Sequence, residues 1–228
     1  MCDEQLGKVL DKMDEYDMWQ DTMLIVNTDH GYLLGDHGYW AKNYMPLYQE
    51  IVHLPLFIYD PRCGKHGERR QALVQTIDIP ETLLGFFKVD IPDRMKGFDL
   101  CETIDMDKKV RDTALFGIHG AHVCITDGNY VYMRAPISEE NKPLYEYTWM
   151  PTHMAGFFEK RELENARMVS GGKFTGELPI PQIPAECYIS AYQYGNLLFD
   201  LKKDPQQENS IENSEREMYF VNEMRKLM

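Results

Sequence analysis

The chain has 228 residues, of which 43% are hydrophobic and 12% aromatic, enough to bury a core in one large or two small domains. Its 24 Lys and Arg stand against 37 Asp and Glu, and this net charge of −13 argues against nucleic acid as a partner. Apolar runs such as Met23–Val26 are far shorter than the roughly 20 residues that cross a bilayer, so no membrane partner is expected.

The cysteines and the start of the chain indicate a compartment. Five cysteines are spread widely without a C-x-x-C pair, which predicts reduced thiols rather than a disulfide framework or a zinc ribbon. The first residues are polar and acidic rather than basic and then apolar, so the sequence as given is expected to be cytoplasmic.

The first hundred residues have the pattern of an α/β layer. Helical spacing of apolar residues predicts helices at 4–18, 45–52 and 71–87, the last divided at Pro80. Apolar, β-favouring runs at 22–28 and 54–59 predict two buried strands, and we interpret the first as a parallel strand within a βαβ-like unit. Residues 90–97 have the composition of a linker.

The second half contains shorter β-like runs. Those at 114–118, 123–127 and 129–134, with an Asp127-Gly128 turn, predict an antiparallel meander. Residues 136–187 include six prolines and predict mostly loop, with a helix near 155–168. A strand at 195–201 precedes a terminal helix at 214–228, whose expected inward residues are Met218, Val221, Met224 and Leu227.

The densest cluster of reactive side chains follows the strand at 22–28. Between Thr28 and Lys42 the chain contains two carboxylates, two imidazoles and one ammonium group. Asp29 and His30 come just after the strand, where both side chains can turn toward one cation and offer it oxygen and nitrogen. A lysine beside such a cation would bind the oxygens of an anionic substrate or stabilise a leaving group.

The same residues also have plainer interpretations. An Asp-His-Gly sequence after a strand is often a turn with a capping carboxylate. His37 is equally well explained by hydrogen bonds that hold the loop, and a lysine such as Lys42 is usually a solvated surface charge. The residue types alone leave these alternatives open.

The run from Asp29-His30-Gly31 through Gly35-Asp36-His37-Gly38-Tyr39-Trp40-Ala41-Lys42 resembles the sulfatase family of the alkaline phosphatase superfamily. It is most similar to the iduronate sulfatase, choline sulfatase and phosphonate monoester hydrolase type. In that type a lysine follows the aspartate of the D-H-G motif by 13 positions, which is also the separation between Asp29 and Lys42 here. Further stretches resemble the family's preceding helix, its I-D-x-x-P-T-L-L helix, its late hairpin and its closing segment, at 1–11, 76–84, 126–132 and 198–209.

The resemblance implies a fold and a division of the chain. The fold class is α/β, namely the later half of an alkaline-phosphatase-like α/β sandwich followed by a small α+β subdomain with an antiparallel sheet. Residues 1–100 would be the C-terminal part of the catalytic domain, and residues 101–228 the small C-terminal subdomain. The sequence contains neither the family's C/S-x-P-x-R nucleophile motif nor its Asp-Asp pair of metal ligands. We expect both upstream, so that this chain alone is inactive.

The resemblance also implies the function and the site residues. The chain would be part of a sulfuric ester hydrolase that cleaves sulfate esters with a divalent metal and an upstream formylglycine nucleophile. Asp29 and His30 would bind the metal, expected to be Ca²⁺ with Mn²⁺ or Mg²⁺ as alternatives. Lys42 would contact the sulfate and its leaving oxygen, and His37 would border the substrate pocket. The expected substrate is a small-molecule sulfate ester, such as a sulfated sugar.

Two alternatives to this function stay open. One is a phosphonate monoester or phosphodiester hydrolase of the same superfamily, because the Asp29 to Lys42 run suits both. The other is an inactive fragment that acts only by binding. The strand ending at Asp29 would then present an open edge, for which we expect self-association or pairing with the missing N-terminal half. An export signal would also lie on that half. His119 and His122 would either reach the substrate entrance or be partly buried polar groups of the later sheet.

Overall fold

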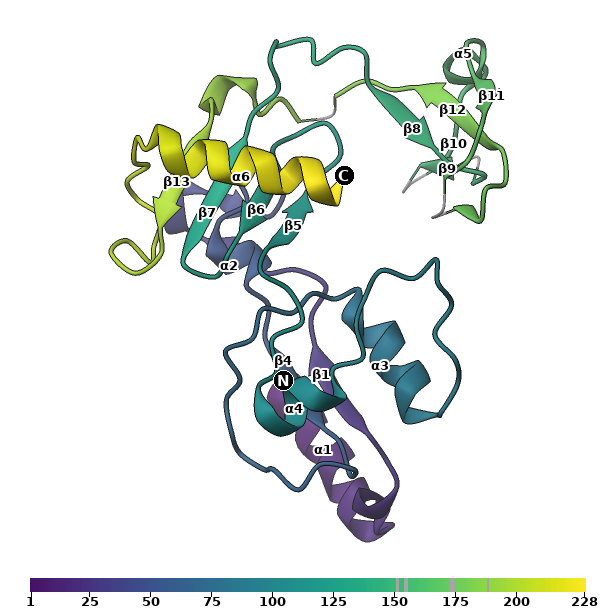
Figure 1. Ribbon diagram of the computed structural model, residues 1–228, viewed down its shortest axis with the longest axis vertical. Helices are drawn as coiled ribbons and strands as arrows, with labels where there is room; N and C mark the ends of the chain where they lie inside the picture. Colours follow the sequence, from purple (N-terminus) through teal and green to yellow (C-terminus); the bar gives the residue numbers. More distant parts are fainter. Residues whose placement is uncertain (151, 154–155, 173–174, 188) are drawn as a thin grey trace. The chain divides into compact units, whose positions relative to one another are not determined.

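The computed structural model describes residues 1–150, 152–153, 156–172, 175–187 and 189–228, which form two compact units (Figure 1). Unit 1 comprises residues 1–29, 54–91 and 96–112, and unit 2 comprises residues 30–53, 92–95 and 113–228. Each unit is therefore assembled from separate stretches of the chain. The domain boundary at residue 100 stays a prediction.

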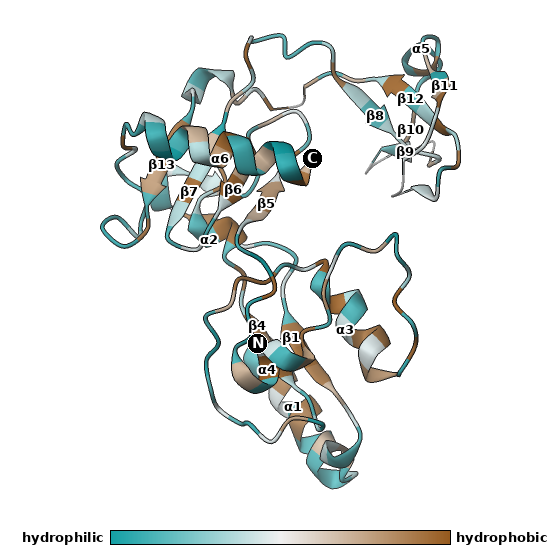
Figure 2. Cartoon of the chain, in the orientation of Figure 1, coloured by the Kyte–Doolittle hydropathy of each residue, from teal (hydrophilic) through white to brown (hydrophobic). Residues whose placement is uncertain are grey.

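Unit 1 combines helices with one two-stranded ribbon, whose strands are apolar (Figure 2). Its elements are α1 (Cys2–Glu15), η1 (Met18–Gln20), β1 (Leu24–Asn27), β4 (Leu56–Tyr59), α3 (Asp78–Phe86) and α4 (Cys101–Met106). Strands β1 and β4 pair antiparallel, with Asn27 opposite Leu56. The prediction of a parallel strand in a βαβ-like unit is wrong, because the chain leaves and returns at the same end of the ribbon.

Helix α3 begins at Asp78. The prediction of a helix from residue 71 is therefore wrong for residues 71–77, which are not helical. Pro80 is the third residue of the helix, where a backbone N–H has no partner within the helix, so the proline fits the first turn instead of dividing a longer helix. The fully buried Asp78 carboxylate accepts hydrogen bonds from the backbone nitrogens of Gln75 at 2.7 Å and Phe98 at 2.9 Å. This carboxylate thus fixes the chain on both sides of α3.

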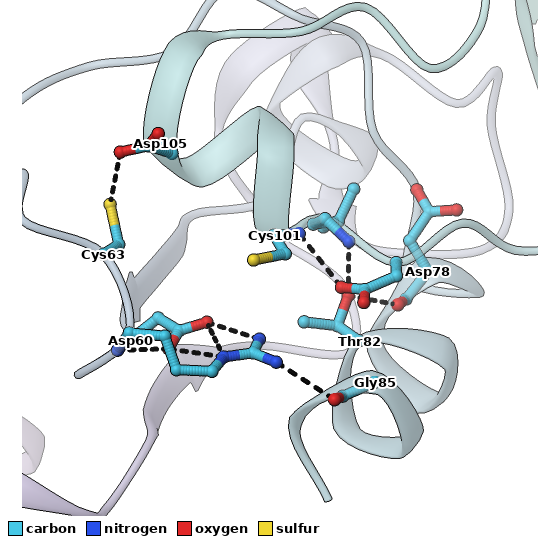
Figure 3. A network of polar contacts seen from close by, with 10 residues as sticks. Asp60, Cys63, Asp78, Thr82, Gly85, Cys101 and Asp105 are labelled. Atoms are coloured by element: carbon cyan, nitrogen blue, oxygen red, sulfur yellow. Dashed lines mark hydrogen bonds and ion pairs between the residues drawn. The ribbon is translucent and has the colours of Figure 1, made fainter. Parts of the chain in front are cut away.

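Polar contacts join α3 to the segments around it (Figure 3). The Thr82 hydroxyl donates to the Asp78 carbonyl at 2.7 Å and accepts from the backbone nitrogen of Leu100, just before α4, at 3.0 Å. Both carboxylate oxygens of Asp78 pair with the guanidinium of Arg111. Because these groups are buried, each needs its partner to offset lost hydration.

Unit 2 is organised around a four-stranded antiparallel sheet in the order β13-β7-β6-β5. These strands are β5 (Ala114–Gly117), β6 (Val123–Thr126), β7 (Tyr130–Arg134) and β13 (Leu197–Asp200). The antiparallel meander predicted from the sequence is confirmed. A smaller hairpin precedes it in the chain, formed by β2 (Leu33–Leu34), η2 (Asp36–Gly38) and β3 (Trp40–Ala41), and is followed by α2 (Gln49–Val52).

The terminal helix α6 (Ser214–Leu227) lies across the four-stranded sheet (Figure 1). Its residues Phe220 and Met224, four positions apart, form a buried cluster with Ile125, Tyr132 and Leu198. The predicted inward positions of Met218 and Leu227 are wrong, since these side chains are 58% and 52% exposed. The helix therefore buries a narrower stripe, centred on a phenylalanine that we did not include.

The proline-containing region after β7 contains more strand than predicted. It has a three-stranded antiparallel sheet in the order β11-β12-β8 and a small hairpin. These elements are β8 (Tyr145–Tyr147), β9 (Thr152–His153), β10 (Gly156–Phe157), α5 (Lys160–Leu163), β11 (Arg167–Val169), β12 (Ile180–Pro184) and then η4 (Tyr192–Tyr194). The helix predicted near 155–168 is the single turn α5; position 155 itself lies outside the described residues. Pro181 still contributes to pairing through its carbonyl, which accepts from the Thr148 backbone nitrogen at 3.3 Å.

Across the described ranges, no helix is both long and apolar enough to span a membrane.

Replacing Arg111 by Met tests the ion pair with Asp78. The guanidinium is 8% exposed and the carboxylate fully buried, so its removal leaves an uncompensated buried charge. We expect a loss of about 3–5 kcal/mol in the free energy of unfolding, measured by urea denaturation. Lys109→Met is the matched control, because its ion pair with Asp112 is on the surface, and its midpoint should stay close to that of the parent. Equal midpoints for both variants would contradict this assignment.

The buried His122 predicts a pH dependence of stability. Burial lowers its pKa, and the hydrogen bond from Nε2 to the Gly195 carbonyl at 2.9 Å offsets this only in part. Below the ordinary value of about 6.5, the unfolded chain therefore binds a proton that the folded chain excludes, and stability falls as the pH is lowered. Urea denaturation at pH 7.5 and 5.5 should show a smaller loss for His122→Gln than for the parent. His119→Gln, which keeps His122, should retain the parent's loss; an unchanged loss in His122→Gln would refute the assignment.

Candidate functional site

The loop that carries the predicted site is held by a close backbone approach at Gly31. The Gly31 nitrogen donates to the Ile51 carbonyl at 2.8 Å, and a Cβ at Gly31 would lie 1.7 Å from the Glu50 carbonyl oxygen. Only glycine fits this contact without moving the backbone. The start of the loop is therefore fixed against helix α2.

The two predicted metal ligands are consecutive residues that belong to different units. Asp29 is the last residue of unit 1, and its exposed carboxylate accepts from the Thr28 hydroxyl at 3.4 Å. His30 is the first residue of unit 2 and is half-buried. Their role as a ligand pair stays a prediction.

His30 and Lys42 lie together in unit 2. The Nδ1 atom of His30 is 2.9 Å from the Gly31 carbonyl, which can only accept, so Nδ1 carries the proton. The Nε2 atom then presents its lone pair, and the Lys42 ammonium lies 2.7 Å from it. Hairpin β2–β3 thus returns the chain so that a lysine 12 positions later meets this imidazole. The backbone carbonyl has selected the tautomer that leaves Nε2 as a ligand or acceptor.

His37 is packed into the loop. Its side chain is 10% exposed and stacks on Tyr48 with ring centroids 3.6 Å apart and an angle of 6° between the planes. Its Nε2 atom is 3.5 Å from the Glu50 carboxylate. The residue has a φ of +52°, a left-handed conformation in which a bulky side chain is uncommon. These contacts give His37 a clear role in holding the loop, and its substrate contact stays a prediction.

Two long-range hydrogen bonds fix the ends of the segment after Lys42. The Tyr194 hydroxyl, in η4, donates to the Tyr44 carbonyl at 3.3 Å and is 3.1 Å from the Tyr39 hydroxyl. Burial, followed by the hydrogen bond with Tyr39, raises the pKa of Tyr194 to about 12, so the phenol keeps its proton near neutral pH. We did not predict Tyr194, because it is 155 positions from Tyr39 and no local pattern marks it.

The second long-range bond begins helix α2. The backbone nitrogen of Gln49, the first residue of α2, donates to the side-chain oxygen of Gln207 at 2.7 Å. Gln207 is 2% exposed, so this cap is shielded from water. One of the free N–H groups at the helix start is satisfied in this way by a residue from the end of the chain.

The donor set alone does not make a metal centre. Asp29 and His30 offer one carboxylate and one imidazole, whereas Ca²⁺ takes six to eight oxygens. Apart from the six masked positions, the structure contains no group of three or more His, Cys, Asp or Glu side chains placed to hold a metal. A resident metal would require further ligands. The Nε2 atoms of His119 and His122 contact the carbonyls of Tyr145 and Gly195.

Comparisons with known proteins find similarity to one family over the part of the chain that contains this loop. Residues 1–89 match the family model described as Sulfatase. The chain is 34% identical over 132 residues to an arylsulfatase from Clostridium perfringens, covering 56% of this chain and 26% of that protein. Residues 1–89 are therefore similar to the sulfatase family. A second relative, the N-acetylglucosamine-6-O-sulfatase of Bacteroides thetaiotaomicron, is 29% identical over 107 residues, or 47% of this chain and 19% of that protein. The resemblance seen in the sequence is confirmed.

Solved structures extend the sulfatase likeness to the fold of the chain. The protein BT4656, in complex with its substrate D-glucosamine-2-N,6-O-disulfate, matches with a TM-score of 0.62 over 99% of this chain and 37% of that chain, at 19% identity. At this identity the likeness concerns the fold, and it confirms the predicted fold class. The chain spans about a quarter or less of the two curated sulfatases named above.

Replacing Gly31 by Ala tests the contact that holds the sulfatase loop. The added Cβ would collide with the Glu50 carbonyl, so the Gly31–Ile51 hydrogen bond must lengthen or break. We expect a loss of about 1–3 kcal/mol in the free energy of unfolding, measured by urea denaturation. Gly172→Ala is the control, because a Cβ there meets nothing within 4 Å, and its stability should change by less than about 0.5 kcal/mol. A Gly31→Ala protein as stable as the control would show that the loop does not depend on this contact.

Proposed function

We propose that this chain supplies the later part of the active site of a sulfuric ester hydrolase. Lys42 binds the sulfate group and its leaving oxygen, and Asp29 and His30 contribute two ligands to a divalent metal. The supporting observation is the pair formed by His30 Nε2 and Lys42 Nζ at 2.7 Å. The ammonium donates to the Nε2 lone pair here, so a metal bound at Nε2 would replace this contact and leave Lys42 beside it, free to turn to a sulfate oxygen.

The charges of these residues suit an anionic ester. The Lys42 side chain is exposed, so its ammonium is accessible to a substrate. An ammonium beside a sulfate oxygen stabilises the negative charge that develops on the leaving oxygen when the ester bond breaks. The Gly31 carbonyl accepts from Nδ1 of His30, so Nε2, which now accepts from Lys42, is the ring nitrogen that would bind a cation. The metal is proposed to be Ca²⁺, with Mn²⁺ or Mg²⁺ as alternatives.

The remaining parts of the proposed enzyme come from sequence outside these 228 residues. No cysteine or serine in the chain is followed by proline two positions later, and no Asp-Asp pair occurs. The proposal places the formylglycine nucleophile and the further metal ligands upstream, and pairs this chain with that part of the protein. The substrate is proposed to be a small sulfate ester such as a sulfated sugar, which is supported by the sulfated sugar bound to the structural neighbour BT4656.

The test begins with the coding DNA upstream of Met1. An in-frame Asp-Asp pair followed by C/S-x-P-x-R is expected, and the complete protein should hydrolyse an aryl sulfate. Lys42→Ala should lower kcat/KM about 100-fold or more, because a positioned charge at the leaving oxygen is lost. Lys65→Ala is the control, since this lysine is also exposed but lies in unit 1 outside the loop, and it should keep the parent rate.

Three results would overturn the proposal. The first is the absence of both motifs from the locus, and the second is an unchanged rate in Lys42→Ala. The third is faster turnover of an aryl phosphonate monoester than of the aryl sulfate, which would establish the alternative hydrolase of the same superfamily.

A further inference from the structure

Two cysteines of unit 1 approach the same face of helix α4. Cys101 is the first residue of α4, and Asp105 follows one turn later on the same face, a spacing at which Cβ atoms lie about 5–6 Å apart. The Cys63 thiol donates to the Asp105 carboxylate, with Sγ 3.4 Å from Oδ1. In Figure 3 the Cys101 sulfur points from α4 toward the segment that carries Asp60 and Cys63. The two thiols are therefore neighbours, although a long segment that includes α3 separates them in the sequence.

The electrostatics of the two thiols also connect them. Burial raises the pKa of Cys101, the Arg62 guanidinium opposes this rise, and a charge on Cys63 adds to it. Burial likewise raises the pKa of Cys63. Interactions between charged groups fall off within about 10 Å in salt solution, so the influence of Cys63 on Cys101 supports their proximity.

The two thiols differ in their access to solvent. Cys63 is 6% exposed, whereas Cys101 is half-buried and lies near the Arg62 guanidinium. A cation beside a sulfur stabilises the thiolate, which is the form that attacks a disulfide. Cys101 is thus the thiol that a small disulfide from solution reaches first, and Cys63 is placed to react with it afterwards.

We propose that Cys63 and Cys101 form a redox-sensitive clip in unit 1, which closes as an intramolecular disulfide when the chain meets a small-molecule disulfide such as oxidised glutathione. The Cys101 thiolate attacks one sulfur of that disulfide, forms a mixed disulfide and releases one glutathione thiolate. The Cys63 thiolate then attacks the Cys101 sulfur and releases the second glutathione thiolate. These two thiolates take up the protons that the cysteines lose, so one disulfide is reduced as the other forms. The clip is independent of the hydrolase function proposed above.

The clip closes the segment of chain that carries α3. Hydrogen bonds already hold this helix at both ends of the segment, because the Thr82 hydroxyl accepts from the Leu100 nitrogen at 3.0 Å and Arg62 Nη1 donates to the Gly85 carbonyl at 3.0 Å. A disulfide adds a covalent link between the chain after β4 and the start of α4, and it replaces the hydrogen bond from Cys63 to Asp105. Since a cross-link restricts the unfolded chain, the oxidised form resists unfolding more than the reduced form does.

Equilibration of the 228-residue chain with mixtures of oxidised and reduced glutathione, at about pH 8 where thiols exchange readily, tests the clip. After alkylation and digestion with trypsin without reduction, mass spectrometry should find peptides 63–65 and 97–108 joined, two hydrogen atoms lighter than their sum. Dithiothreitol should separate them. The oxidised chain should also unfold at a higher urea concentration than the reduced chain, a rise that Cys63→Ser should not show.

Two comparisons separate the clip from unspecific oxidation. Cys187→Ser is the matched control, because Cys187 is half-buried like Cys101 but belongs to unit 2, and it should leave the joined peptides unchanged. The equilibrium constant for joining Cys63 to Cys101 should be at least about tenfold larger in the folded chain than in urea, because the fold holds the two sulfurs near each other. Failure of the folded chain to join the two peptides, or equal constants in the folded and the unfolded chain, would overturn the clip.

Discussion

The approach of the Gly31 backbone to residues 50 and 51 is the contact on which the candidate site depends. A Cβ at this position would overlap with the Glu50 carbonyl oxygen, so the backbone of the loop and the backbone of helix α2 are in direct contact. From this fixed point the Gly31 carbonyl sets the proton position on His30, and the β2–β3 hairpin returns Lys42 to Nε2 of the same ring. The position of the Gly31 backbone thereby determines both the tautomer of His30 and the contact of its Nε2 atom with Lys42.

Around this contact, the loop is stabilised from a distant part of unit 2. Tyr194 links Tyr39 and Tyr44 through its hydroxyl, which donates to the Tyr44 carbonyl and lies 3.1 Å from the Tyr39 hydroxyl. The conformation of the sulfatase-like run of residues therefore depends on hydrogen bonds to a residue outside it. Its geometry is completed by η4.

The sequence predicted what is encoded locally. The meander β5-β6-β7 follows from short β-favouring runs and an Asp-Gly turn, and the run from Asp29 to Lys42 was found because its residues lie within one loop. The direction of β4 was missed, since an apolar strand has the same composition in either direction. Strand β12 was missed because prolines normally argue against a strand, although Pro181 needs only its carbonyl there. Tyr194 and Gln207 could not be found, because their partners are 150 or more positions away.

The cap that Gln207 provides to Gln49 has a consequence for the order of folding. The two residues are 158 positions apart, so helix α2 lacks this buried hydrogen bond until nearly the whole chain exists. At a synthesis rate of about 5–20 residues per second, a ribosome needs about 8–30 s to make the intervening residues. The loop with His30 and Lys42 therefore leaves the ribosome well before the group that completes its support. During that interval the start of α2 lacks the buried acceptor that Gln207 later provides.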